Sequence, residues 1–278
     1  MAMTTGEFSY LQSLLHLHTG IVLEAGKEYL AESRLAPLAR HAGFDSLAEM
    51  IAQLRTRSPN GLHRQVIEAM TTNETFFFRD FPAFQALKSR LLPELIEKRA
   101  LERRLSVWCA ACSSGQEPYS VAMILHDLPG ITGWQRRILG TDLSEAMLDR
   151  ARAGRYSQLE INRGLPAPLL VRHFTREGLE WEIGSDLRAA VEFRRMNLSD
   201  PWPALPPMDL VLMRNVLIYL GSETRARVLE RVRAVLADGG YLLLGGAEGT
   251  LGIDDAFERV DLGGGAAAFR LNAVREKC

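Results

Sequence analysis

Apolar residues in the first 70 positions recur at the three- and four-residue spacing of amphipathic helices. Gly43 is typical of a helix end, and a turn at 58–61 precedes a further short helix from 62 to 70. We therefore expect a small all-helical domain over residues 1–70, with Pro37 interrupting its second helical segment. The apolar sets are Phe8, Leu11, Leu14, Leu15 and Leu17; Leu30, Leu35, Leu38 and Ala39; and Leu47, Met50, Ile51 and Leu54.

From Thr71 onward, short apolar runs alternate with helical patterns. After a long helix at about 84–99, the expected strands are 105–110, 137–141, 191–195, 209–213 and 241–244. The expected helices between them are 117–128, 144–153 with Ser144 as N-cap, and 222–236 with Gly239 at its end. This alternation predicts an α/β fold in which helices cover a parallel sheet.

The last part of this larger domain, which we place at 71–278, has a different pattern. Residues 257–261 and 267–271 flank three consecutive glycines, which predicts an antiparallel hairpin that closes the sheet. Between about 171 and 190, short alternating pieces around Gly178 predict a small inserted β-subdomain.

Composition and charge narrow the class of protein. Hydrophobic residues make up 47% of the 278 residues and charged residues 24%, which favours a packed, soluble protein. The net charge of −1 gives no support for binding nucleic acid. No apolar run approaches the roughly 20 residues of a membrane span, and residues 1–18 lack the pattern of a signal peptide. We expect a cytoplasmic protein without direct membrane insertion.

The cysteines agree with that location. Cys109, Cys112 and Cys278 are an odd and sparse set, which fits a reducing compartment. Cys109 and Cys112 form a C-x-x-C motif, but no second pair completes a zinc site, and Cys109 falls in an apolar strand pattern. We interpret both as small buried residues at a strand end and expect no metal site.

Two strand ends carry candidate ligand-binding residues. After the strand at 105–110, a turn of small residues that includes Gly115 leads into a helix with Glu117 in its first turn. Small residues let a ligand approach the backbone, and the carboxyl ends of parallel strands are the usual ligand edge. Glu117 is either a ligand-binding carboxylate or a residue that stabilises the helix N-terminus. At the end of the next strand, Asp142 can accept hydrogen bonds from the ribose of an adenosine; the alternative role of helix cap is already filled by Ser144.

Two other segments combine polar and apolar residues. In residues 72–80, three phenylalanines stand between Asn73, Thr75 and Arg79. We interpret the phenylalanines as core anchors, whereas the Arg79 guanidinium is suited to holding a carboxylate. Asn215 follows the last buried strand before the 222–236 helix, either as a site residue or as a turn former.

Five motifs in this order resemble those of the chemotaxis receptor methyltransferases, the CheR family. They are N-E-T-F-F-F-R-D at 73–80, A-C-S-S-G-Q-E-P-Y-S at 111–120, G-T-D-L-S at 140–144, N-L at 197–198 and R-N-V-L-I-Y at 214–219. The match covers nearly the whole chain. It implies a doubly wound, Rossmann-like methyltransferase sheet with an antiparallel final strand, preceded by a small helical domain.

The resemblance also implies a reaction, in which S-adenosylmethionine donates a methyl group to receptor glutamates and S-adenosylhomocysteine is the product. Arg79 and Tyr219 are the candidates for handling the incoming glutamate. The implied cofactor-binding residues are Asn73, Thr75 and Arg79 at the methionine end, Gly115 and Glu117 near the methionyl amine, Asp142 at the ribose, Asn197 and Leu198 at the adenine, and Asn215 and Val216 along the floor.

Receptor docking is a further implication. In the family, a basic helix of the N-terminal domain is thought to contact the methylation helices of the receptor. Here Lys27, Arg34 and His41 recur every seven residues, and Arg40 adds charge nearby. We expect a monomer that docks through the region of Lys27, Arg34 and Arg40, with an ordinary solvated helix face as the alternative.

Some family members hold a receptor C-terminal pentapeptide on the inserted β-ribbon, through an extra glycine-containing loop. The segment 174–179 is shorter than the corresponding loop of those members, so we expect a pentapeptide-independent enzyme. Three alternatives stay open: a methyltransferase of the same fold with another acceptor, a non-catalytic binding module, and a nicotinamide dehydrogenase, whose glycine fingerprint is missing.

Overall fold

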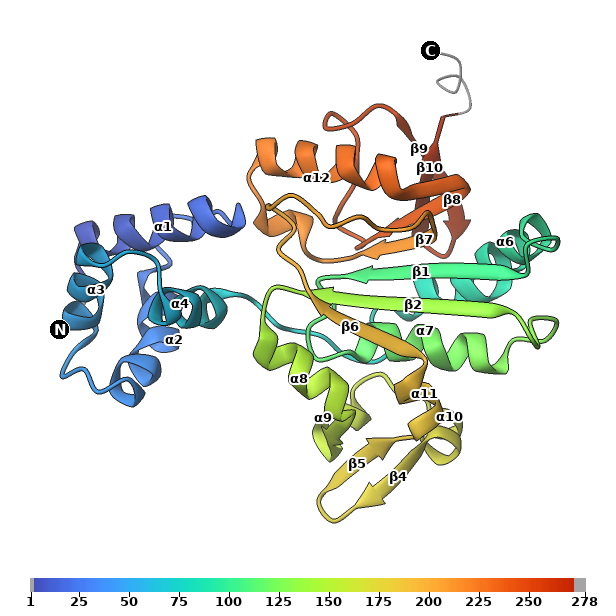
Figure 1. Ribbon diagram of the computed structural model, residues 1–278, viewed down its shortest axis with the longest axis horizontal. Coiled ribbons are helices and arrows are strands. Elements are labelled where there is room, and N and C mark those ends of the chain that lie inside the picture. Colours follow the sequence, from blue (N-terminus) through green and yellow to red (C-terminus); the bar gives the residue numbers. More distant parts are fainter. Residues whose placement is uncertain (1–2, 273–278) are drawn as a thin grey trace. The chain divides into compact units, whose positions relative to one another are not determined.

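A computed structural model of the chain describes residues 3–272, which form two compact units (Figure 1). The first unit contains the first 72 residues and two segments that return to it, Leu198–Asp200 and Tyr219–Arg225. The second unit contains the rest. Cys278 lies outside the described residues. No helix in residues 3–272 is long and apolar enough to cross a membrane.

The N-terminal unit is helical, as its apolar spacing predicts. Its helices are α1 (Thr5–Thr19), α2 (Glu28–His41), α3 (Leu47–Thr56) and α4 (Gly61–Met70). Three of the helices begin at a side-chain cap, in which the oxygen of Thr4, Ser46 or Asn60 accepts a backbone N–H of the first turn. The apolar faces form a core in which Leu11 and Leu35 are fully buried.

Pro37 does not interrupt the second helix, contrary to the prediction from sequence. α2 continues through Pro37 to His41. A proline costs the helix one hydrogen bond, but Leu35 and Ala39 on either side are buried in the core of the unit, and this packing keeps the helix intact. The expected stop at Gly43 is confirmed: Gly43 has a φ of +83° just after the helix end.

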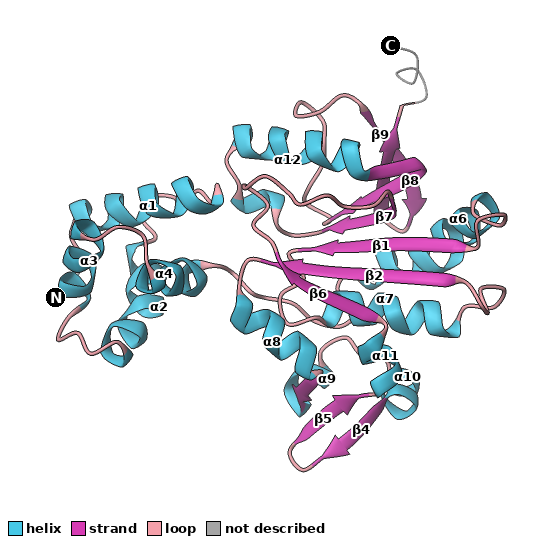
Figure 2. Ribbon diagram, viewed as in Figure 1, coloured by secondary structure: helices cyan, strands magenta, loops and turns pink. Residues whose placement is uncertain are grey.

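The second unit is built on a seven-stranded sheet (Figure 2). The first five strands in spatial order are parallel to one another, and β10 is antiparallel to both of its neighbours. The antiparallel final strand is therefore confirmed. The strands in spatial order are β6 (Val191–Arg195), β2 (Gln135–Asp142), β1 (Arg104–Ala110), β7 (Met208–Met213), β8 (Leu236–Leu244), β10 (Ala266–Leu271) and β9 (Phe257–Gly263).

The order of the strands explains why helices cover both faces of the sheet. From β1 the chain moves outward to β2 and β6, and from β7 it moves the other way to β8. Right-handed crossovers in opposite directions place their helices on opposite faces. The crossover helices are α7 (Gln116–Asp127), α8 (Glu145–Ala153, capped by Ser144) and α12 (Ser222–Val235).

The helix before β1 begins earlier than predicted and has a wide turn. It consists of α5 (Phe81–Ala86), a π-helical turn η1 (Leu87–Leu91) and α6 (Leu92–Lys98). Pro93 has no N–H for the α-helical bond to Ser89, and this is where the helix widens. Phe84 and Leu91 still bury their side chains in the core of the unit.

Gly239 does not end the last crossover helix. α12 stops at Val235, and β8 starts at Leu236. The pairing of β7 with β8 shifts register between Met208 and Leu210, so the residues around Gly239 form an irregular first half of the strand. Gly239 has a φ of +68°, a conformation that glycine adopts readily.

The inserted β-subdomain is present, but it has one strand more than the sequence suggested. β4 (Phe174–Glu177) and β5 (Glu180–Ile183) form the expected hairpin, and β3 (Arg155–Ser157) pairs with the other edge of β5. β3 is only three residues long, too short for an alternating pattern to reveal. Short helices complete the region: α9 (Gln158–Asn162), α10 (Ala167–His173) and α11 (Ser185–Ala189); η2 (Leu217–Tyr219) is a 3-10 turn after β7.

Candidate functional site

Three segments of the second unit meet at the carboxyl edge of the central strands: residues 73–80, the β1–α7 loop and the segment after β7. Six non-glycine residues in the described chain have a positive φ, and five of them lie in these segments. They are Phe78, Asp80, Ala111, Ser113 and Asn215. Non-glycine residues adopt this conformation at a cost in energy, and such strain gathers at functional sites.

Asp142 connects the loops after β1 and β2. Its Oδ2 accepts a hydrogen bond from the Ser113 N–H at 2.7 Å, and its Oδ1 accepts one from the Ser144 N–H at 2.9 Å. The carboxylate is buried, with 7% of the residue exposed. These backbone bonds fix the orientation of the carboxylate at the strand edge.

Glu117 forms an ion pair that the sequence did not reveal. The Arg214 Nη1 donates to the Glu117 Oε2 at 3.0 Å, and the side chains of Arg214 and Glu117 are only 2% and 12% exposed. Burial raises the pKa of the Glu117 carboxyl, and the neighbouring Arg214 opposes that rise. Glu117 is therefore a buried carboxylate whose ionised form Arg214 favours.

Arg214 also binds residues 79 and 80. Its Nη2 donates to the Arg79 carbonyl oxygen at 2.8 Å and to the Asp80 Oδ2 at 2.7 Å, and its guanidinium lies 5.3 Å from the centre of the Phe84 ring. The arginine follows a fully buried strand directly. A charged residue at that position is the signal that sequence reasoning passed over.

Segment 73–80 is attached at two further points, one to the β1–α7 loop and one to α7. The Ser113 hydroxyl donates to the Asn73 carbonyl oxygen at 2.8 Å, and the Phe78 N–H donates to the Ser120 Oγ at 3.0 Å. Phe77 and Phe78 are buried, as expected for core anchors, whereas Phe76 is only half-buried. The apolar residues hold the segment so that its polar residues stay at the strand edge.

The Arg79 side chain is half-buried at that edge. Its Nη1 donates to the Glu74 carbonyl oxygen at 2.9 Å, and its guanidinium lies 5.7 Å from the centre of the Phe76 ring. The fork of the guanidinium retains further donors for a carboxylate. Thr75 is half-buried in the same segment.

Asn215 and Val216 are positioned by Glu248, a residue that sequence reasoning missed. One Glu248 oxygen accepts the N–H groups of Asn215 at 2.6 Å and Gly245 at 2.8 Å, and the other accepts those of Val216 at 2.9 Å and Ile218 at 3.2 Å. The Asn215 Oδ1 is buried and has no hydrogen-bond partner among the described residues. The signal for Glu248 is a lone acid in the glycine-rich sequence after β8.

Three of the predicted site residues lie where the chain passes from one unit to the other. Asn197 is the last residue of one segment of the second unit, whereas Leu198 and Tyr219 belong to the first unit. In that unit, Leu198 is buried, and the Tyr219 carbonyl oxygen accepts a hydrogen bond from the Val22 N–H at 2.9 Å.

Cys109 and Cys112 are buried, as expected, with exposures of 0% and 2%. Burial raises the pKa of both thiols well above the ordinary value, so neither is ionised at neutral pH. Gly115 ends the loop after Cys112 with a φ of +92° and begins α7.

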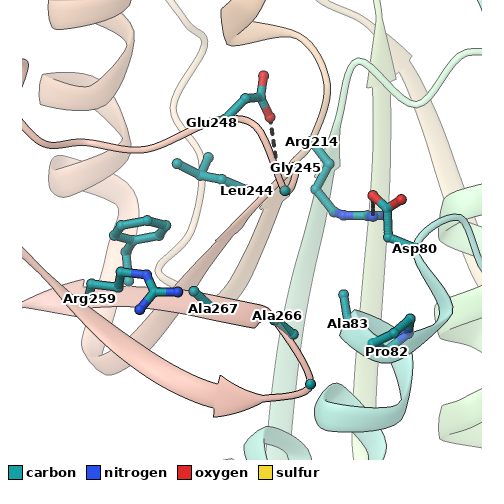
Figure 3. A pocket seen from close by; sticks show the side chains of 14 residues that line it. Asp80, Pro82, Ala83, Arg214, Leu244, Gly245, Glu248, Arg259, Ala266 and Ala267 are labelled. Carbon is teal, nitrogen blue, oxygen red and sulfur yellow. Dashed lines mark hydrogen bonds and ion pairs between the residues drawn. The ribbon is translucent and has the colours of Figure 1, made fainter.

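A pocket of about 320 Å³ borders the site beyond Arg214 (Figure 3). Its walls come from the start of α5, the ends of β7 and β8, and the β9–β10 hairpin. Asp80, Arg214, Glu248 and Arg259 are the charged residues that line it.

Comparison with known proteins places both units in one family. Residues 6–71 match the CheR methyltransferase all-alpha domain, and residues 73–264 match the CheR methyltransferase SAM binding domain. The chain is 40% identical over 265 residues to chemotaxis protein methyltransferase 1 of Pseudomonas aeruginosa, with 94% of this chain and 96% of that protein covered. It is 39% identical to chemotaxis protein methyltransferase Cher2 of Pseudomonas putida, covering 93% and 96%, and 39% identical to chemotaxis protein methyltransferase 1 of Vibrio cholerae, covering 88% and 90%. The chain therefore belongs to the CheR methyltransferase family of chemotaxis proteins, and its second unit is an S-adenosylmethionine-binding domain.

Proposed function

We propose that this protein methylates glutamate side chains of bacterial chemoreceptors in the cytoplasm, forming glutamate methyl esters. The observation that carries the proposal is the set of acceptor groups at one edge of the sheet, Glu117, Asp142 and the unpartnered Asn215 Oδ1, with the Arg79 guanidinium in the adjoining segment. Membership of the CheR family supports the choice of acceptor.

The residues fit S-adenosylmethionine. A buried carbonyl oxygen without a partner and a buried carboxylate are both acceptors, as an amino acid's ammonium group requires. We assign Glu117 and Asn215 to the methionyl amine, with Gly115, Asn73, Thr75 and Val216 around it. We assign Asp142 to the ribose hydroxyls, and Asn197 and Leu198 to the adenine.

The reaction asks the protein mainly for positioning. When bound, S-adenosylmethionine supplies a methyl group on a positively charged sulfonium. A glutamate with an ordinary pKa of about 4.3 is already ionised at neutral pH, so no side chain has to act as a general base. The task of Arg79, with Tyr219 as its candidate companion, is to hold the acceptor carboxylate in line with the methyl group. A loose hold suits this task, because a carboxylate oxygen engaged by a strong bond attacks more slowly.

Receptor docking through the N-terminal unit is part of the proposal, but Arg34 has a smaller part in it than the sequence suggested. The Arg34 Nη1 donates to the carbonyl oxygens of Met70 and Thr71 at 2.7 and 2.9 Å, so its guanidinium is engaged at the end of α4. Lys27 pairs with Glu24, and their side chains are 43% and 71% exposed. Arg40 is exposed near the end of α2, and we assign the docking charge chiefly to Arg40 and Lys27.

We also propose that the protein acts as a monomer and does not require a receptor-tail pentapeptide. In the subdomain, Glu177 pairs with Glu180, so the β4–β5 hairpin turns through only two residues, Gly178 and Leu179. This leaves no extra loop at the place where pentapeptide-dependent relatives carry one. Binding of a receptor C-terminal pentapeptide to the purified protein, measured by calorimetry, would overturn this part of the proposal.

The decisive experiment is methyl transfer from radiolabelled S-adenosylmethionine to a panel of purified chemoreceptors. We expect label on receptor that mild base releases as methanol, and no label on receptors whose methylation-site glutamates are replaced by alanine. Label that resists base would point to the same fold acting on a different acceptor. Cofactor binding without transfer to any receptor would favour the non-catalytic alternative.

A further inference from the structure

The pocket beyond Arg214 is separate from the groups that we assign to the cofactor. Arg214 lines the pocket, whereas its ion-pair partner Glu117 does not. The Arg214 guanidinium therefore stands between Glu117 and the pocket. Glycines and alanines of the strand ends and the hairpin, such as Gly245 and Ala266, form much of the wall and leave room for a side chain from outside (Figure 3).

The two acids that line this pocket already have partners. The Asp80 Oδ2 accepts from Arg214 at 2.7 Å. The Glu248 carboxylate accepts four backbone N–H groups, including those of Asn215 and Gly245. Neither carboxylate therefore needs a cationic group of a ligand to satisfy it.

The two arginines of the pocket retain donors without partners. The Arg214 Nε is buried and has no hydrogen-bond partner among the described residues, and the Arg214 side chain is only 2% exposed. Arg259, on β9, is exposed, and its side chain forms no hydrogen bond or ion pair with the described residues. Its guanidinium points into the pocket (Figure 3). An orphaned buried donor and a free guanidinium together select a hydrogen-bond-accepting anion.

Resting on the proposed function, we propose that this pocket binds an acidic side chain of the receptor segment other than the glutamate that is methylated. A carboxylate fits better than a phosphate dianion, because Asp80 and Glu248 already place two negative charges on the wall. The occupant is not the reacting glutamate, because Arg214 separates the pocket from Glu117. The pocket thus recognises a second acidic residue of the substrate and determines which glutamates are methylated.

The test is steady-state methylation of a chemoreceptor cytoplasmic fragment by wild-type protein, Arg259→Gln and a matched control, Arg270→Gln. Arg270 lies on the same hairpin but is paired with Glu258 and does not line the pocket. We expect Arg259→Gln to raise the KM for the fragment about tenfold, equivalent to about 1.4 kcal/mol. The kcat and the affinity for S-adenosylhomocysteine should stay within twofold of wild type, and Arg270→Gln should leave all three unchanged.

A double-mutant cycle identifies the occupant. Acidic residues of the fragment near the methylated glutamate are replaced singly by the corresponding amides. For wild-type enzyme, the amide at one of these positions should raise the KM for the fragment about tenfold. For the Arg259→Gln enzyme, the same amide should raise the KM little further, because the two changes remove the same contact. A KM within twofold of wild type for Arg259→Gln, or additive effects at every position, would overturn the pocket assignment while ester formation by wild type left the proposed function standing. An equal loss of S-adenosylhomocysteine affinity would also overturn it, because the pocket would then belong to the cofactor.

Discussion

Glu248 and Asn215 are 33 positions apart in the chain, yet the Glu248 Oε2 accepts the backbone N–H of Asn215 at 2.6 Å. The contact holds Asn215 in the left-handed conformation, with a φ of +58°, and buries the Asn215 Oδ1 without a partner. Space there is tight: a Cβ added to Gly245 would lie 2.7 Å from the Asn215 Nδ2. Glu248 therefore shapes a site residue without belonging to the motifs that mark the family.

We predict that Glu248→Gln weakens cofactor binding. The amide nitrogen of glutamine faces backbone N–H groups, so half of the bonds become donor-to-donor contacts, at a cost of about 1–3 kcal/mol. We expect a lower melting temperature and an affinity for S-adenosylhomocysteine about tenfold below wild type at 25 °C, where the variant is still folded. Glu248→Asp should recover neither, because its carboxylate is one methylene short. Wild-type affinity in a destabilised Glu248→Gln would show that Glu248 acts on stability alone.

Sequence reasoning recovered the sheet because its central strands are short apolar runs, such as 105–110 and 241–244. It also found the positions where strands end, such as Asp142 and Asn215, since the ligand edge of a parallel sheet follows from topology. It could not find the Arg214–Glu117 pair, whose partners lie just after β7 and in α7, 97 positions apart. Local patterns carry no information about such contacts.

The errors have physical causes of the same kind. Pro37 is a helix breaker locally, yet tertiary packing outweighs its cost. β3 has only three residues, and its pairing with β5 crosses two helices of the chain. The contact of the Arg34 guanidinium with carbonyl groups at the end of α4 was likewise absent from the local sequence pattern, and docking through this region stays a prediction.

Cofactor affinity should depend on pH through Glu117. In the protein without ligand, burial raises the pKa of the Glu117 carboxyl above the ordinary value of 4.5. An ammonium ligand favours the ionised form, so we expect S-adenosylhomocysteine affinity to fall as the pH is lowered through the raised pKa.

The free energy of unfolding should depend on pH in the opposite direction. Because the pKa is raised in the folded state, Glu117 adds stability below about pH 4.5, and this contribution is lost as the pH rises through the folded-state pKa. Calorimetry between pH 5 and about 8 should show a dependence that Glu117→Gln weakens; an unchanged dependence in the variant would assign it to another group.

Asp142→Asn should reduce cofactor affinity more than it reduces stability. The amide keeps one oxygen for a backbone N–H but turns a donor toward the other, and it loses the charge that favours ribose hydroxyls. We expect at least a tenfold loss of S-adenosylhomocysteine affinity. Ser144→Ala is the matched control, because it removes the cap of α8, worth about 1 kcal/mol, and leaves the carboxylate in place. If both variants lost affinity equally, the loop rather than the carboxylate would be the determinant.

Arg79→Ala should separate binding from turnover. Among the described residues, the Arg79 side chain donates one hydrogen bond, from its Nη1 to the Glu74 carbonyl oxygen at 2.9 Å, so its loss should leave the segment in place. We expect S-adenosylhomocysteine affinity within a few fold of wild type and a fall in kcat of about 100-fold, a magnitude typical of lost positioning. Arg79→Lys keeps the charge without the fork and should recover only part of the rate. Near-wild-type turnover of Arg79→Ala would remove Arg79 from the reaction.

Charge reversal in α2 tests the docking surface, provided that structural arginines are kept out of the comparison. Arg34→Glu would leave the carbonyl oxygens of Met70 and Thr71 without their donor and face them with a carboxylate, so a loss of activity there would report on folding. Arg40 is exposed, and Arg40→Glu should leave the melting temperature unchanged. If α2 contacts the receptor, Arg40→Glu raises the KM for receptor several fold, and the effect shrinks with added salt because exposed charges are screened. Arg64→Glu, an exposed arginine on α4, is the control for net charge. Equal KM values for Arg40→Glu, Arg64→Glu and wild type at low salt would mean that this face of α2 is solvated rather than docked.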